Sequence, residues 1–150
     1  MTRLSFLCPV HREWVYFHSQ TALSYLEEAQ KKGETLMQES DWQEALPFLG
    51  CAFETTEILI EVQDTEKTFL LGRLTTLSIL LAKTFNQLGK CNHGRLILEQ
   101  AENRLQNVAT ISLGHKLRLS FVLQCISSIR HCMKQYESFS NKILGIAKPY

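Results

Sequence analysis

Apolar residues recur every three or four positions along nearly all of this 150-residue chain, and this spacing constrains its fold most strongly. Such spacing gathers apolar side chains on one side of a helix, whereas a half-buried strand would require alternation at every second residue. Glycine occurs 7 times and proline 3 times, so few positions interrupt helices. The sequence therefore predicts an all-α protein of about six helices, folded as a single domain over residues 1–150.

Capping residues and breaks predict where the first helices begin and end. The first helix should run from about residue 11 to about residue 39, after a proline. Ser40 or Asp41 should cap a second helix, which Pro47 should bend unless it marks the first turn. The polar stretch 63–67 should separate this second helix from a third.

The remaining helices are predicted from the same kinds of signal. Gly89 should end the third helix in a left-handed conformation, and Asn92 should cap a fourth that reaches about residue 108. Ser112 should cap a fifth helix, over about residues 113–133. A shorter sixth helix should hold four apolar residues, Phe139, Ile143, Leu144 and Ile146.

Composition places the chain among soluble, cytoplasmic proteins. Hydrophobic residues make up 45% of the chain and no uninterrupted apolar run approaches the roughly 18 residues of a membrane span. The apolar stretch near the N-terminus is too short for an export signal, and Leu7 stands before Cys8 where a lipoprotein signal needs a small residue. The five cysteines are odd in number and irregularly spaced, so we expect reduced thiols.

The small net charge of +1 conceals an asymmetry between the two halves of the chain. Residues 1–66 carry 4 basic and 12 acidic side chains, whereas residues 67–150 carry 12 basic and 3 acidic ones. This distribution either creates a dipole that steers partners or lets the two halves neutralise each other within one fold.

Two segments of the chain match each other in the order of their small and large side chains. Small residues at Gly33, Ala45, Ala82 and Gly94 should let two antiparallel helices approach closely, while large neighbours fill the adjoining gaps. The first segment has its matching positions at Gly33, Leu36, Trp42, Ala45, Leu49 and Ala52. The second has them at Ala82, Phe85, Gly89, Gly94, Leu98 and Ala101.

This pattern resembles the tetratricopeptide repeat (TPR). The resemblance implies three antiparallel helical hairpins stacked into a TPR-like array, the third from a degenerate unit near the C-terminus. Equivalent positions lie about 49 residues apart, against roughly 34 in the family, so the helices or their connections should be longer. Glu57 and Gln106 stand where the family has a closing proline. A generic antiparallel helical bundle is the alternative fold.

The resemblance also implies a function, namely binding another protein or a peptide in a groove between hairpins, as an adaptor, chaperone or regulator. Gln30 and Glu34 stand where one subclass has the pair that binds a terminal carboxylate, which argues against that ligand. The positions that match the family's groove are Gln30, Glu34, Met37, Gln38, Ile79, Lys83, Asn86, Gln87, Gln124 and His131.

Neither catalysis nor a cofactor is predicted. The sequence has no glycine-rich phosphate loop, no nucleophile elbow and no pair of histidines four residues apart on a helix. Cys8 with His11, and Cys91 with His93, have spacings of incomplete zinc sites, so we expect no bound metal.

Besides protein binding, two other functions and one question about the aromatic residues remain open at this point. The basic second half would suit a regulator that contacts nucleic acid. A signalling or metal-binding helical bundle is the third interpretation. The crowded aromatics Trp14, Tyr16 and Phe17 either pack beneath the terminal hairpin or are exposed for contact in a homodimer.

Overall fold

Six α-helices follow one another in the computed structural model, which describes residues 4–62 and 68–143, with residues 139–143 as backbone alone. No strand occurs in these described ranges, so the predicted all-α class and number of helices are confirmed. The helices are α1 (Pro9–Phe17), α2 (Ser19–Gln38), α3 (Trp42–Val62), α4 (Thr68–Gln87), α5 (Cys91–Ile111) and α6 (Lys116–Ile143).

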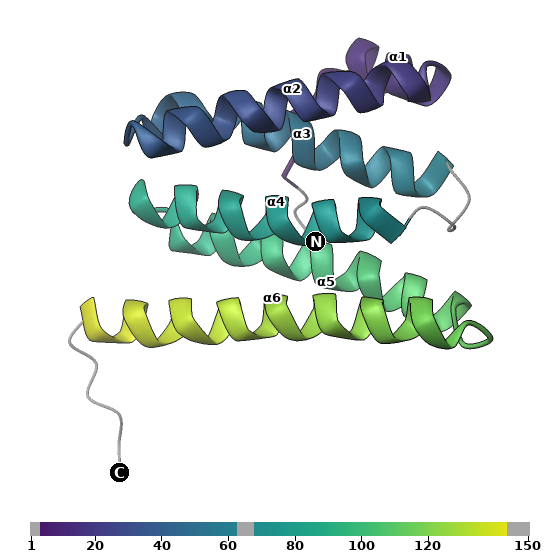
Figure 1. The fold of residues 1–150 in the computed structure, drawn as a ribbon. Coiled ribbons are helices and arrows are strands. Elements are labelled where there is room, and N and C mark those ends of the chain that lie inside the picture. The colour runs from purple at the N-terminus through teal and green to yellow at the C-terminus, as the bar shows by residue number, and fades with distance from the viewer. Residues whose placement is uncertain (1–3, 63–67, 144–150) are drawn as a thin grey trace.

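The long helices form a stack of antiparallel neighbours (Figure 1). Helix α2 pairs with α3, and α4 pairs with α5 as a second hairpin. Helix α6 packs on α4 and α5, so the second hairpin lies between α6 and the first hairpin. The short α1 folds back over α3. This layered arrangement is an antiparallel helical array, in which the two ends of the stack do not meet.

Small residues occupy the closest contacts within each hairpin, as the sequence pattern predicts. A Cβ atom placed on Gly33 would lie 2.6 Å from Cδ2 of Leu49, and one on Gly94 would lie 3.1 Å from the carbonyl oxygen of Ala82. Ala45 is fully buried and Ala82 is almost so. These four positions therefore face the neighbouring helix, where a larger side chain would push the helices apart.

Helix α3 contains a long, fully buried segment. Every residue from Ala52 to Leu59 is buried, because α1, α2, α4 and the N-terminal residues surround this part of the helix. Two of the buried side chains, Glu54 and Glu57, are carboxylates. A buried carboxylate is costly unless other groups donate hydrogen bonds to it, so both glutamates must have partners.

Helix α4 is, within the described residues, long and apolar enough to cross a membrane by length and composition. More than half of that window, 56%, is buried inside the structure. The core helix of a soluble protein has the same composition, so this finding is weak evidence for a membrane span.

The predicted first helix is wrong in one respect, because it is broken into α1 and α2 at His18. His18 has φ −130° and ψ 52°, outside the helical region. Neither glycine nor proline marks the break. Contacts of α1 with α3, including the complete burial of Val15, outweigh the local preference for a continuous helix.

Of the two predicted caps for α3, Asp41 lies immediately before the helix, and its carbonyl accepts from the N–H of Ala45 at 2.9 Å, whereas Ser40 lies one residue earlier. Ser40 has φ 60° and belongs to the turn that ends α2, and its N–H donates to the carbonyl of Met37 at 3.0 Å. Helix α3 then begins at Trp42, so Pro47 is its sixth residue and lies inside the helix. Pro47 therefore does not mark the first turn.

Boundaries in the second half are partly as predicted. Gly89 has φ 75° and follows the end of α4, as expected for a left-handed stop. Helix α5 begins one residue before Asn92, with Lys90 at the N-cap, and Ser112 follows its end instead of starting the next helix. The predicted Asn92 and Ser112 caps are therefore wrong.

The fifth and sixth predicted helices form the single helix α6. Residues 134–138, between them, contain no glycine or proline, so nothing ends the helix there. The side chains of Phe139 and Ile143 and all of Leu144 and Ile146 lie outside the described residues.

Candidate functional site

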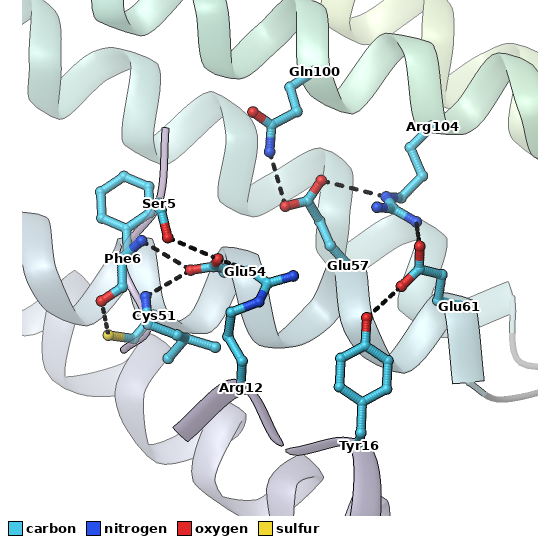
Figure 2. A network of polar contacts seen from close by, with 11 residues as sticks. Ser5, Phe6, Arg12, Tyr16, Cys51, Glu54, Glu57, Glu61, Gln100 and Arg104 are labelled. Carbon is cyan, nitrogen blue, oxygen red and sulfur yellow. Dashed lines mark hydrogen bonds and ion pairs between the residues drawn. The ribbon is translucent and has the colours of Figure 1, made fainter. Parts of the chain in front are cut away.

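Residues 4–8 precede α1 without helical structure and lie against α3. The backbone N–H groups of Phe6 and Leu7 donate to Oε2 of Glu54 at 2.8 and 2.6 Å, and the Ser5 hydroxyl donates to Oε1 at 3.3 Å (Figure 2). Cys51 Sγ contacts the carbonyl oxygen of Phe6 at 3.8 Å. The helical array thus holds a non-helical peptide segment largely through its backbone groups.

Arg12 of α1 supplies the positive charge for this site. Its guanidinium pairs with Oε1 of Glu54, a residue only 1% exposed. The side chain of Arg12 is 30% exposed, so the pair lies at the edge of the buried region. Glu54 therefore has two backbone donors, a hydroxyl and a cation, which together stabilise the buried carboxylate.

Gly50 has no side chain, and the space beside it holds the aromatic ring of Phe6. A Cβ on Gly50 would lie 2.1 Å from Cδ1 of Phe6, so any larger residue would displace the ring. The ring of Phe6 also lies 6.5 Å, centroid to centroid, from that of Phe85 on α4. Phe6 thus contacts both hairpins, since Gly50 belongs to the first and Phe85 to the second.

The second buried carboxylate connects α3 to α5. Glu57 accepts hydrogen bonds from Gln100 Nε2 at 2.9 Å and from Arg104 Nε at 3.3 Å (Figure 2). Arg104 also lies 3.8 Å from Glu61, which accepts a hydrogen bond from the Tyr16 hydroxyl at 2.7 Å. The bond to Glu61 is the main reason that the pKa of Tyr16 is raised. This network joins α1, α3 and α5.

An open cavity of about 150 Å³ lies between the second hairpin and α6. Ala82, Leu98 and Met133 supply its apolar wall, and polar side chains supply the rest. We call this space the α4–α6 cavity. It is lined by Ala82, Asn86, Cys91, Asn92, Gly94, Arg95, Leu98, Met133, Tyr136 and Glu137.

Neighbouring groups fix the orientation of one polar side chain in the α4–α6 cavity, Asn86, and raise the pKa of another, Tyr136. The thiol of Cys91 donates to Oδ1 of Asn86 at 2.7 Å, which fixes the side-chain amide. Burial raises the pKa of Tyr136 to about 12, with a further contribution from Cys132. The phenol is therefore a neutral hydrogen-bonding group at physiological pH.

The predicted groove residues on α2 do not form one open surface. Gln38 is exposed and Glu34 half-exposed, but Gln30 accepts a hydrogen bond from Arg73 of α4 at 2.8 Å. Met37 is buried in the core, at 9% exposure. Met37 therefore stabilises the first hairpin and is not available to a partner in this structure.

Of the predicted residues on α4 and α6, only Asn86 and His131 line a described depression, and each lines a different one. Asn86 lines the α4–α6 cavity, and Lys83 and Gln87 are exposed on the same helix, with Ile79 half-buried. Gln124 and His131 are exposed on α6. His131 lines a different depression, which we call the outer groove, lined by Gln106, Leu123, Ile126, Ser127, Arg130, His131 and Lys134.

Sequence reasoning missed Gly50, Glu54 and the segment that they hold. Glu54, like Glu57, lies in the otherwise uncharged stretch between Leu49 and Ile60, and a carboxylate in such a stretch signals a buried polar contact. Its partners, however, are 42 to 49 residues away in the chain, so no local pattern could identify them.

Cysteines and histidines form no metal site in the described part of the chain. Within residues 4–62 and 68–143, no group of three or more histidine, cysteine, aspartate or glutamate side chains is placed to hold a metal ion. All five cysteines are unpaired, and burial raises the pKa of Cys51, Cys125 and Cys132.

No protein-family model, curated protein or solved structure matches the chain.

Proposed function

We propose that this protein is a TPR-like, protein- or peptide-binding module of the cytoplasm, an adaptor, chaperone or regulator, and that it binds an extended segment of a partner. The α4–α6 cavity is the site that we assign to this segment. The observation that carries the proposal is this cavity itself, because it opens between one hairpin and the next helix and contains the predicted residue Asn86.

The chemistry of the cavity suits one side chain of an extended peptide. Leu98 and Met133 offer apolar contacts for an anchoring side chain of moderate size. Asn86, Asn92 and Arg95 surround that apolar wall with groups that donate hydrogen bonds to peptide carbonyls. An apolar anchor framed by backbone hydrogen bonds is a common way to recognise an extended segment.

The array's own N-terminal residues support the proposal independently. Glu54 accepts two backbone N–H groups, from Phe6 and Leu7, while the Phe6 ring occupies the space at Gly50. Within one chain, the helical array therefore already holds a non-helical segment through its backbone N–H groups and one aromatic side chain.

The rival interpretation, contact with nucleic acid, is weakened by the pairing of the basic residues. Arg73, Arg104 and Arg130 each pair with a glutamate. A paired guanidinium contributes less to phosphate binding, because its partner must first be displaced. The outer groove keeps Arg130, His131 and Lys134 together and is where this alternative is tested.

Two matched double variants test the proposal. Asn92→Ala with Arg95→Glu changes the rim of the α4–α6 cavity, and Gln106→Ala with Arg130→Glu makes corresponding changes at the outer groove. Both arginines are exposed to a similar extent, 57% and 58%, and each pairs with one glutamate, so thermal denaturation of both variants checks that they remain folded.

The measurement is capture of the partner from the native cells, followed by titration of the purified partner at two salt concentrations. We expect the cavity variant to lose the partner and the outer-groove variant to keep it, with only a weak dependence on salt. Loss in the outer-groove variant alone, with binding that weakens steeply in salt, would instead support nucleic-acid or other electrostatic contact.

A further inference from the structure

The break between α1 and α2 is confined to a single residue. The N–H of His18 donates to the carbonyl oxygen of Trp14 at 2.9 Å, in the last turn of α1. The carbonyl oxygen of His18 accepts from the N–H of Ala22 at 2.8 Å, in the first turn of α2. Only the dihedral angles of His18, φ −130° and ψ 52°, depart from a helix. A change at this one residue would make residues 9–38 a continuous helix.

The bent form is locally unfavourable. No side chain caps the start of α2, so the N–H groups of its first turn lack a side-chain acceptor. In a continuous helix, the carbonyls of the preceding turn would accept them. Phe17, His18 and Ser19 are all compatible with a helix interior. The side chain of His18 supports the bend, since Nδ1 bonds to the Trp14 carbonyl at 3.1 Å and the two rings stack at 5.7 Å.

Contacts of residues 4–17, which we call the arm, with α3 stabilise the bend. Leu7 and Val15 are buried against the rest of the molecule. Arg12 and the backbone of the segment satisfy Glu54, and Tyr16 donates to Glu61 at 2.7 Å. Without the arm, Glu54 would lose the two backbone N–H groups, the hydroxyl and the guanidinium that stabilise its carboxylate, so an equivalent segment that docks there restores these contacts.

We propose that the arm exchanges between two copies of this chain, with His18 as the hinge. In the exchanged dimer α1 and α2 form one helix, which extends about 14 Å beyond Ser19. Each arm docks on α3 of the other copy and restores there the contacts to Glu54 and Glu61. The dimer is closed, because each copy gives one arm and receives one.

A second copy is the occupant that fits the site, because the site recognises several features of the arm together. It accepts two adjacent backbone N–H groups, takes a phenylalanine ring at Gly50 and pairs with a guanidinium six residues after that phenylalanine. Another copy supplies all three with the same spacing. This inference is independent of partner binding at the α4–α6 cavity.

Two substitutions at the hinge test the exchange in opposite directions. His18→Ala removes the side chain that supports the bend and raises helix propensity, so the dimeric fraction should rise several-fold. Ser19→Pro fits the first position of α2 but disrupts a continuous helix, because its ring clashes with the carbonyl of Val15. Ser19→Pro should therefore stay monomeric. Light scattering after size exclusion, over a range of concentrations, gives the mass.

Crosslinking decides whether a dimer is formed by exchange. Cys8, in the arm, is two residues from Phe6, whose carbonyl oxygen lies 3.8 Å from Sγ of Cys51 on α3. In a Cys91→Ser background, a short bismaleimide should join these two thiols within one chain in the monomer and between chains in the dimer. Cys8→Ser and Cys51→Ser, made separately, are the controls, because each should remove both products if the link joins Cys8 to Cys51.

The outcomes separate cleanly on a denaturing gel. A covalent dimer from the dimeric fraction of the wild type or of His18→Ala supports the exchange. A dimeric fraction that yields only the link within one chain would show association through another surface and overturn it. So would a monomeric mass for both proteins at every concentration. Because these tests use proteins other than Ser19→Pro, instability of that variant leaves the decision unaffected.

Discussion

The two helices of the second hairpin approach each other closely because Gly94 lacks a side chain. The atoms that a Cβ there would meet are the carbonyl oxygen and Cα of Ala82, at 3.1 and 3.3 Å. Backbone atoms of a buried helix cannot rotate away as the end of a flexible side chain can. The spacing of small residues in the sequence therefore corresponds to helix contacts too close for a larger side chain.

Gly94→Leu should lower the free energy of unfolding by roughly 1–3 kcal/mol, because the larger side chain must separate α4 from α5. Gly114→Leu is the control, since a Cβ at Gly114 meets nothing within 4 Å. Urea denaturation of the two variants measures the difference. Equal stability of the two variants would contradict the close packing of this hairpin.

Glu54→Gln tests the recognition of the N-terminal segment. The amide keeps the volume of the side chain but loses its charge and one acceptor, so unfolding should become easier by about 1.5–3 kcal/mol. The backbone amides of Phe6 and Leu7 should also exchange faster with solvent deuterium. The exposed Glu13→Gln on α1 should change neither quantity.

At the scale of the helices, the sequence predicts the helical type better than the boundaries, and the number agrees because the split at His18 offsets the merging of two predicted helices into α6. Helical periodicity is carried by many residues at once, so it survives local exceptions. The break at His18 is set by contacts of α1 with α3, such as Arg12 with Glu54 at 42 residues' separation in the chain, which no local signal encodes. Similarly, capping residues predict a start near Ser112, but the chain forms a turn there before α6 begins at Lys116.

The same limit explains the candidate site. Small residues such as Gly33 and Gly94 were recognisable because their role follows from spacing along one helix pair. Gly50 and Glu54 were not, because their roles depend on Phe6 and its neighbours in the N-terminal segment. The repeat pattern assigns Met37 to the groove, yet Met37 is buried in the core.

Pro47 provides a test of helix energetics in α3. As the sixth residue of the helix it lacks the N–H that would bond to Gln43 and crowds that carbonyl. Pro47→Ala should therefore raise the free energy of unfolding by about 1–3 kcal/mol, after allowing for the more flexible unfolded chain.

Pro9→Ala is the matched control for Pro47→Ala, because Pro9 is the first residue of α1, where proline is favourable. This control should leave stability unchanged or lower it by up to about 1 kcal/mol. Thermal and urea denaturation measure both variants. A loss of stability in Pro47→Ala would show that α3 depends on the proline.

For the whole molecule, the opposite charges of the two halves partly neutralise each other inside the fold. Glu57 of the acidic half pairs with Arg104 of the basic half, and Glu27 lies 3.8 Å from Arg73. Glu57 is 1% exposed, so its pair is screened far less by salt than a surface pair. The asymmetry thus contributes to joining the two hairpins.

Arg104→Ala should destabilise the protein by roughly 2–4 kcal/mol, because it removes the cation beside a buried carboxylate. Arg95→Ala removes a surface pair with Glu99 on the same helix and should cost no more than about 0.5 kcal/mol. Chemical denaturation compares the two. Similar small effects would mean that the contact between α3 and α5 does not couple the hairpins.

Binding of a partner segment between the second hairpin and α6 is tested most directly by hydrogen–deuterium exchange of the full chain, free and with its captured partner. Binding at the α4–α6 cavity should slow exchange around residues 82–98 and 133–137 and leave residues 102–130 unchanged. Protection confined to residues 102–130, with none around the cavity, would contradict the assignment.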